Sequence, residues 1–150
     1  MAEFYSIQDV LSFAIRLEQA SQAFYRHLSS IVDSPSVSRY LDTLISEEIL
    51  HEQRLRKVLN EQGGILDTSI SAEEVQSYIQ AMEVPPSLNY KGAVRIARDK
   101  EKAAQMLYSV IAGATNDPVL QDVFKQLSTQ EKIHRQFFEN EYRTICLSEN

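Results

Sequence analysis

Two copies of a Glu-x-x-His motif are the residues in this sequence that could do chemistry. The first copy runs from Glu48 to His51 and the second from Glu131 to His134, 83 residues further on. Residues three apart share one face of a helix, so each copy places a carboxylate beside an imidazole. Carboxylate and imidazole together are ligands suited to iron or manganese. The motif pair therefore indicates a metal site.

A longer repeat contains these motifs. The offset of 83 residues also carries Glu18 onto Glu101, and in each half this glutamate precedes the glutamate of the motif by 30 residues. When the chain turns back into an antiparallel helix, this spacing therefore places the Glu-x-x-His motif level with the first glutamate along the bundle axis. The six predicted metal ligands are Glu18, Glu48, His51, Glu101, Glu131 and His134.

Apolar residues at helical spacing place these ligands on four helices. Ser6 with Asp9 predicts an N-terminal cap, and Ser34-Pro35 and Asp117-Pro118 predict two further helix starts. Gly63-Gly64 predicts a helix end. The helices are expected at about residues 7–31, 35–62, 89–114 and 118–145.

The connection at residues 65–89 is too long for a hairpin between neighbouring antiparallel helices. Ser71 with Glu74 predicts a capping box that opens a short helix, which ends before Pro85-Pro86. No alternation typical of strands is found. The sequence therefore predicts an all-α domain over residues 1–150, a four-helix bundle of two repeated helix pairs with a long crossover carrying a short extra helix.

Burial of the four glutamates requires compensation of their charge. Each glutamate lies near the middle of an inward-facing line that is otherwise mainly apolar, and no Lys or Arg lies on these four lines. An isolated buried charge costs several kcal/mol, so four carboxylates must be protonated, paired or bound to cations. Two divalent ions would balance them. One Glu-x-x-His alone is weak evidence, but two copies at matching heights on apolar lines predict a two-metal centre.

Tyr25 and Tyr108 lie two turns beyond Glu18 and Glu101 on the same faces. Each hydroxyl is expected to hydrogen-bond a ligating carboxylate across the bundle, because phenylalanine would meet a purely packing role. The expected surface residues are His27, Glu47 and Glu52.

The composition of the chain excludes several classes of binding partner. The net charge is −6, and the 15 Lys and Arg form no basic run, which argues against nucleic acid and anionic membranes. The single cysteine, Cys146, excludes an intramolecular disulfide and fits a reducing, cytoplasmic setting. No apolar stretch has the length of a membrane span, and the N-terminus lacks the features of a signal peptide, so we expect a soluble, unprocessed protein.

The motifs resemble the rubrerythrin branch of the ferritin-like superfamily over nearly the whole chain. The matching segments are Glu18-x6-Tyr25, Glu48-x-x-His51, the run from Ala97 through Glu101-Lys102 and Ala104 to Tyr108, and Glu131-x-x-His134. The resemblance implies a non-haem di-iron centre that reacts with hydrogen peroxide or dioxygen, often in a homodimer or larger oligomer. Ligands of this kind define ferritin-like di-metal bundles.

Two differences from rubrerythrins matter for function. Rubrerythrins proper carry a rubredoxin-like module with four cysteines, which Cys146 alone cannot form, so an external donor such as a rubredoxin-like protein is expected. Rubrerythrins also commonly carry an extra glutamate one turn after the third-helix ligand, where this chain has Ala104. The six-ligand set is then closer to that of ferritins and bacterioferritins.

Three functions remain open from the sequence. The leading hypothesis is a di-iron oxidoreductase, a peroxidase or oxidase with two iron ions per chain, where manganese could occupy one or both positions. Glu18 and Glu101 would be terminal or mobile ligands, Glu48 and Glu131 bridging ligands, and the two motif histidines the nitrogen ligands. The alternatives are a ferroxidase that sequesters iron and, less favoured, a di-iron hydroxylase of an organic substrate, such as the demethoxyubiquinone hydroxylases.

Overall fold

Four long helices form the structure, a computed structural model that describes residues 4–62, 69–71, 73, 76 and 89–149. Their bounds are α1 Ile7–Ile31, α2 Pro35–Gln62, α4 Tyr90–Ala114 and α5 Pro118–Ser148. The predicted helices are confirmed, and the last one continues three residues beyond the expected end at residue 145.

Capping residues fix the helix starts as the sequence predicts. The Ser6 hydroxyl accepts a hydrogen bond from the Asp9 amide, and the Asp9 carboxylate accepts one from the Ser6 amide, which completes a capping box. The Asp117 side chain caps α5 directly before Pro118. These contacts satisfy amide groups that the first helical turn leaves without a partner.

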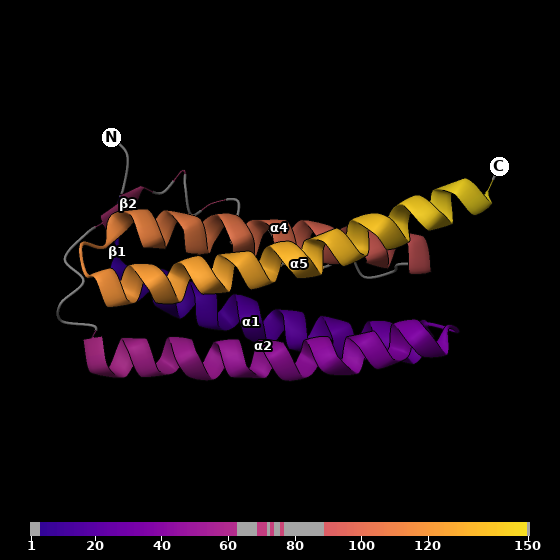
Figure 1. The fold of residues 1–150 in the computed structure, drawn as a ribbon, viewed down its shortest axis with the longest axis horizontal. Helices are drawn as coiled ribbons and strands as arrows, with labels where there is room; N and C mark the ends of the chain where they lie inside the picture. The colour runs from indigo at the N-terminus through magenta and orange to yellow at the C-terminus, as the bar shows by residue number, and fades with distance from the viewer. Residues whose placement is uncertain (1–3, 63–68, 72, 74–75, 77–88, 150) are drawn as a thin grey trace.

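The helices form two antiparallel pairs, α1 with α2 and α4 with α5 (Figure 1). Figure 1 also shows that α2 ends at one end of the bundle and α4 begins at the other, which confirms the long crossover. The short helix expected within the crossover, the capping box to Glu74 and the stop at Gly63-Gly64 lie outside the described residues. None of the described helices is long and apolar enough to cross a membrane.

A small antiparallel ribbon is an addition that the sequence analysis did not predict. Strand β1 (Phe4–Ser6) pairs with β2 (Ser69–Ser71) in the register Phe4 with Ser71, Tyr5 with Ile70 and Ser6 with Ser69. Each strand has three residues, too few to produce a recognisable alternation of apolar and polar positions. The ribbon joins the chain before α1 to the segment after α2.

The interior consists of two apolar clusters, one toward each end of the bundle. One cluster includes Leu11, Leu55, Leu107 and Phe124, and the other includes Leu28, Leu41, Val94 and Phe138. Between them lies the layer of buried glutamates and histidines.

The predicted inward-facing lines are Ile7, Leu11, Ala14, Glu18, Ser21, Tyr25 and Leu28; Val37, Leu41, Leu44, Glu48, His51, Leu55 and Val58; Tyr90, Val94, Ala97, Glu101, Ala104, Tyr108 and Ile111; and Leu120, Phe124, Leu127, Glu131, His134 and Phe138. These positions are confirmed as buried, with two exceptions: Tyr90 is only partly buried, and the side chain of Ile7 lies outside the described part of the chain. The alternating steps of three and four residues therefore identified the core-facing side of every helix.

Truncation of Leu127 tests this core. Leu127 is fully buried in the first cluster, whereas Leu147 on the same helix is 66% exposed. We expect Leu127→Ala to lower the free energy of unfolding by about 2–5 kcal/mol, because it removes buried apolar contacts and leaves a cavity. Leu147→Ala is the matched control and should change it by less than about 0.5 kcal/mol. Equal effects in urea unfolding would contradict the assignment of the core.

Candidate metal centre

The structure brings all six predicted ligands together in the middle of the bundle. Helix α1 contributes Glu18, α4 contributes Glu101, and α2 and α5 each contribute one Glu-x-x-His pair. Every one of the six side chains is buried, with at most 3% of the residue exposed. They converge because equal spacing along antiparallel helices puts the repeated positions at one height.

The six residues form two overlapping groups that could each hold a metal ion. One group is Glu18, Glu48, His51 and Glu131, and the other is Glu48, Glu101, Glu131 and His134. Within each group, one ligand atom per residue lies within 4.8 Å of all the others. Both groups include Glu48 and Glu131. The two shared glutamates would therefore be able to serve both positions.

Both imidazole rings turn their Nδ1 atoms toward the carboxylates. The Nδ1 atom of His51 lies 2.6 Å from Glu131 Oε1 and 3.6 Å from Glu48 Oε1. The Nδ1 atom of His134 lies 3.1 Å from Glu48 Oε1 and 3.5 Å from Glu101 Oε2. The two rings stack with their centres 6.1 Å apart. Each ring therefore offers one nitrogen to its own group of oxygens.

The outer nitrogens of the two histidines have partners that the sequence analysis missed. His51 Nε2 lies 2.6 Å from Gln130 Oε1, and His134 Nε2 contacts the Glu47 carboxylate. When Nε2 donates its proton to these oxygens, the Nδ1 lone pair is left for a metal. The 83-residue repeat could have found this pair, because it relates Glu47 to Gln130.

The prediction that Glu47 and Glu52 are solvated surface residues therefore needs correction. The side chain of Glu47 is 46% exposed, but its carboxylate contacts His134 at the edge of the cluster. Glu52 is 17% exposed and accepts hydrogen bonds from Gln22, Gln19 and Arg56. The prediction missed these contacts mainly because His134 comes from α5, and Gln19 and Gln22 come from α1. His27 is exposed, as expected.

Two buried tyrosines hydrogen-bond Glu18 and Glu101, the two glutamates outside the Glu-x-x-His motifs. Tyr25 donates a hydrogen bond of 2.5 Å to Glu101 Oε1, and Tyr108 donates one to Glu18 Oε1. These are the contacts across the bundle that the sequence analysis expects. Burial, and next the charge of the glutamate that each one contacts, raise the pKa of both phenols well above the ordinary value. Both tyrosines therefore remain protonated donors.

The unpaired polar atoms of the cluster all fit metal ligation. Within the described part of the chain, seven buried ligand atoms have no hydrogen-bond partner: Glu18 Oε2, Glu48 Oε1, His51 Nδ1, Glu101 Oε2, both Glu131 oxygens and His134 Nδ1. Unsatisfied buried polar atoms in such number are unusual in a folded protein. Five carboxylate oxygens and two imidazole nitrogens are a donor set that suits two ions of iron or manganese.

Without metal, protons stabilise the cluster. Burial, and then repulsion between glutamates, raise the pKa values of Glu48 and Glu131 well above their usual range. Burial lowers the pKa values of His51 and His134, but close contact with the surrounding glutamates and their negative charge outweigh this effect and raise both pKa values. Burial also acts to raise the pKa of Glu101, but close contacts with Glu131 and His134 outweigh burial and lower this pKa from its ordinary value.

Lys100 is a buried cation that the inward-facing lines did not include. It is 1% exposed, and its ammonium lies 5.6 Å from the centre of the Phe24 ring. Burial lowers its pKa to about 8, opposed by the charge of Glu101. It belongs to neither of the two ligand groups.

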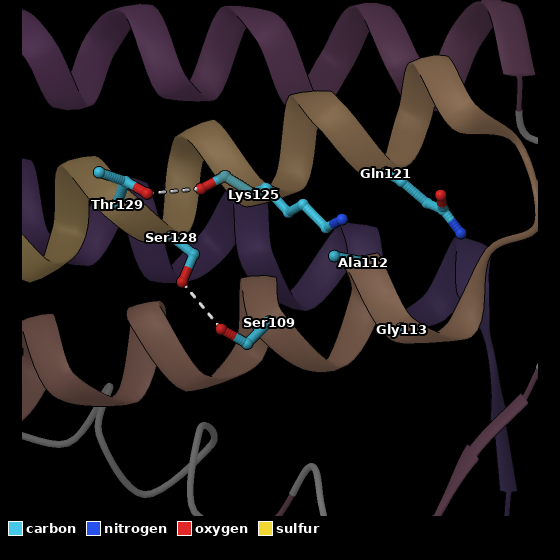
Figure 2. A pocket seen from close by; sticks show the side chains of 7 residues that line it. All are labelled: Ser109, Ala112, Gly113, Gln121, Lys125, Ser128 and Thr129. Atoms are coloured by element: carbon cyan, nitrogen blue, oxygen red, sulfur yellow. Dashed lines mark hydrogen bonds between the residues drawn. The ribbon is translucent and has the colours of Figure 1, made fainter.

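A surface hollow lies between α4 and α5, away from the six ligands (Figure 2). The hydroxyl oxygens of Ser109 and Ser128, which both line the hollow, lie 2.8 Å apart, within hydrogen-bond distance. The side chain of Lys125 extends over the hollow. Its lining residues include none of the six ligands. The hollow and the candidate metal centre are therefore separate features.

A comparison with known families identifies the chain. The rubrerythrin family model matches residues 9–142. The chain belongs to the rubrerythrin family. The match covers all of α2 and α4 and most of α1 and α5, which together carry all six predicted ligands.

Solved structures confirm the ferritin-like fold. A protein from Thermotoga maritima, described as a ferritin-like diiron-carboxylate protein, has a TM-score of 0.78 and 22% sequence identity, over 94% of this chain and 97% of that one. A hypothetical protein from Pyrococcus furiosus has a TM-score of 0.70 and 19% identity, over 93% of this chain and 89% of that one. No curated protein matches the sequence significantly. Family and buried cluster together fit a di-iron protein.

The pKa shifts predict how the stability of the metal-free protein depends on pH. Glu48, Glu131, His51 and His134 all hold protons more tightly in the folded state. The stability that they contribute is complete below their unfolded pKa values and is lost as the pH rises toward the folded values. Two lowered pKa values act in the opposite direction, that of Glu101 below pH 4.5 and that of Lys100 from about pH 8 upward.

We therefore expect the melting temperature of the metal-free protein to fall between about pH 5.5 and about pH 7.5, below the range in which Lys100 titrates. One pKa unit corresponds to about 1.4 kcal/mol, so a fall of several degrees is the expected size. Differential scanning calorimetry with a chelator present measures it. Glu48→Gln should flatten the curve, and a melting temperature that rises with pH in the metal-free protein would contradict the assignment.

Proposed function

We propose that this protein is a non-haem di-iron oxidoreductase that reduces hydrogen peroxide, or activates dioxygen, with electrons from a separate donor protein. The observation that carries the proposal is the pair of four-residue ligand groups that share Glu48 and Glu131. Membership of the rubrerythrin family supports iron as the metal. The donor set also suits manganese in one or both positions.

The ligands divide into roles according to the two groups. We assign Glu18 and His51 to one ion, Glu101 and His134 to the other, and Glu48 and Glu131 as bridges. Four carboxylates then balance two divalent ions, which removes the repulsion that raises the pKa values of the bridging glutamates. No separate acid or base is assigned.

The protein prepares this site in three ways. Tyr25 and Tyr108 fix one oxygen of each terminal glutamate and leave the other oxygen unpaired. The two apolar clusters shield the polar layer from both ends of the bundle, which strengthens electrostatic interactions inside it. Two bound iron ions would supply Lewis acidity and the two electrons that convert one hydrogen peroxide, with two protons, into two water molecules.

Electrons must return to the site after each turnover. The only cysteine among the 150 residues is Cys146, so these residues cannot form a four-cysteine electron relay. We propose a rubredoxin-like protein as the donor. A homodimer or larger homo-oligomer and a cytoplasmic location remain predictions.

Consumption of hydrogen peroxide tests the proposal. Iron-loaded protein with excess reductant should consume peroxide catalytically, and Glu48→Ala should reduce the rate to that of free iron, because it removes a ligand shared by both groups. His27→Ala is the matched control, since His27 is exposed and belongs to neither group. Equal rates for the wild type and Glu48→Ala would rule out peroxide reduction at this site.

Iron oxidation and sequestration is the second candidate. Ala104 is buried where rubrerythrins commonly carry an additional glutamate. The cluster therefore has six ligands, the number that ferritins and bacterioferritins use. This feature supports a ferroxidase that oxidises ferrous iron and holds it or passes it on.

Iron stoichiometry and assembly size separate the two candidates. A peroxidase should bind two irons per chain and remain a dimer or small oligomer in size-exclusion chromatography with light scattering. A storage protein should form a cage or enter an encapsulating assembly and take up many irons per chain. A small oligomer that stops at two irons per chain excludes storage.

A further inference from the structure

The two halves of the metal centre match at every predicted ligand but differ at the atoms behind the histidines. Each half has a terminal glutamate, a shared bridging glutamate, a histidine and a tyrosine that holds the terminal glutamate. Behind His134 lies the carboxylate of Glu47, and behind His51 lies the amide of Gln130. Glu47 and Gln130 occupy equivalent positions of the 83-residue repeat.

This difference changes the donor strength of the two rings. A hydrogen bond from an imidazole N–H to a carboxylate is charge-assisted and is roughly twice as strong as one to a neutral amide. A carboxylate in that position makes the other ring nitrogen a better metal ligand, whereas an amide does so less. The Nδ1 atom of His134, which faces Glu48 and Glu101, is the one that gains from Glu47.

Because Glu47 and Gln130 are both accessible to solvent, their effect on metal binding can be tested without disturbing the fold. The side chain of Glu47 is 46% exposed, and Gln130 is also exposed. Each reaches inward from the surface of the α2 and α5 faces to one buried ring. Exchange of the carboxylate for the amide, or the reverse, therefore buries no new charge and leaves the size of the side chain nearly unchanged.

We propose that Glu47 is a positioning residue that makes the two metal positions inequivalent, so that the position of His134 and Glu101 binds its ion more tightly than the position of His51 and Glu18. The inference rests on the proposed two-metal function. It assigns an order of filling to the two positions. The ion at the weaker position is then the one that exchanges with solution more readily.

Cobalt(II) titration of the metal-free protein tests this order by calorimetry and visible absorption, without any turnover. The wild type should bind two ions in two steps of different affinity. Glu47→Gln should weaken the tighter step by about 10–100-fold, the usual effect of losing such a partner, so that the two steps merge. Gln130→Glu should instead strengthen the weaker step. The double exchange Glu47→Gln/Gln130→Glu should restore two separate steps.

Glu61→Gln is the matched control. It removes the same charge from an exposed position of α2, 14 residues and therefore about 21 Å further along the helix. A gain of affinity in Gln130→Glu is the decisive readout, because a purely structural role for these residues cannot produce it.

Each outcome decides between the inference and the function on which it rests. Two equal steps in the wild type, or constants in Glu47→Gln that match those of Glu61→Gln, overturn the inference and leave the two-metal site intact. A loss in Glu47→Gln without a gain in Gln130→Glu also overturns it. If the wild type binds no cobalt(II), the inference and the proposed two-metal function both fail.

Discussion

The burial of four carboxylates beside two imidazoles is the constraint on which the rest of this structure depends. Each charge in the apolar interior costs several kcal/mol unless a counter-charge or hydrogen bond offsets it. In the metal-free state the raised pKa values of Glu48 and Glu131 show where protons provide that compensation. The seven ligand atoms without hydrogen bonds show where two cations would provide it. The cluster is therefore organised for metal at some expense to the stability of the empty protein.

The surrounding helices make this arrangement specific. Apolar clusters on both sides confine the polar residues to one layer, so the ligands meet one another and not water. Tyr25 and Tyr108 cross the bundle and tie the terminal glutamate of one half to a helix of the other half. Each half thus orients the ligands of the opposite half. A single helix pair would lack both tyrosine–glutamate hydrogen bonds, because each of them joins the two pairs. This dependence gives a physical reason for the duplication.

Duplication does not make the two halves identical. The repeat preserved the ligands and the tyrosines, but Glu47 in one half corresponds to Gln130 in the other. In the repeat, Glu52 of the first half likewise corresponds to Arg135 of the second half. Glu52 accepts a hydrogen bond from Gln22 beside the cluster. Differences of this kind allow a symmetric fold to hold two metal positions with different properties. They lie one layer outside the ligands, where substitutions do not remove the site.

The sequence by itself determined the four helices, their inward faces and the six residues of the cluster. It could do so because helical periodicity, the caps at Ser6 and Asp117 and an 83-residue repeat are all properties of local sequence. Only the tertiary structure showed that Glu47 reaches His134 and that Gln130 reaches His51. Those contacts join helices far apart in sequence, and their geometry depends on how the helices pack and rotate against one another. The three-residue strands, too short for a pattern, also required the fold.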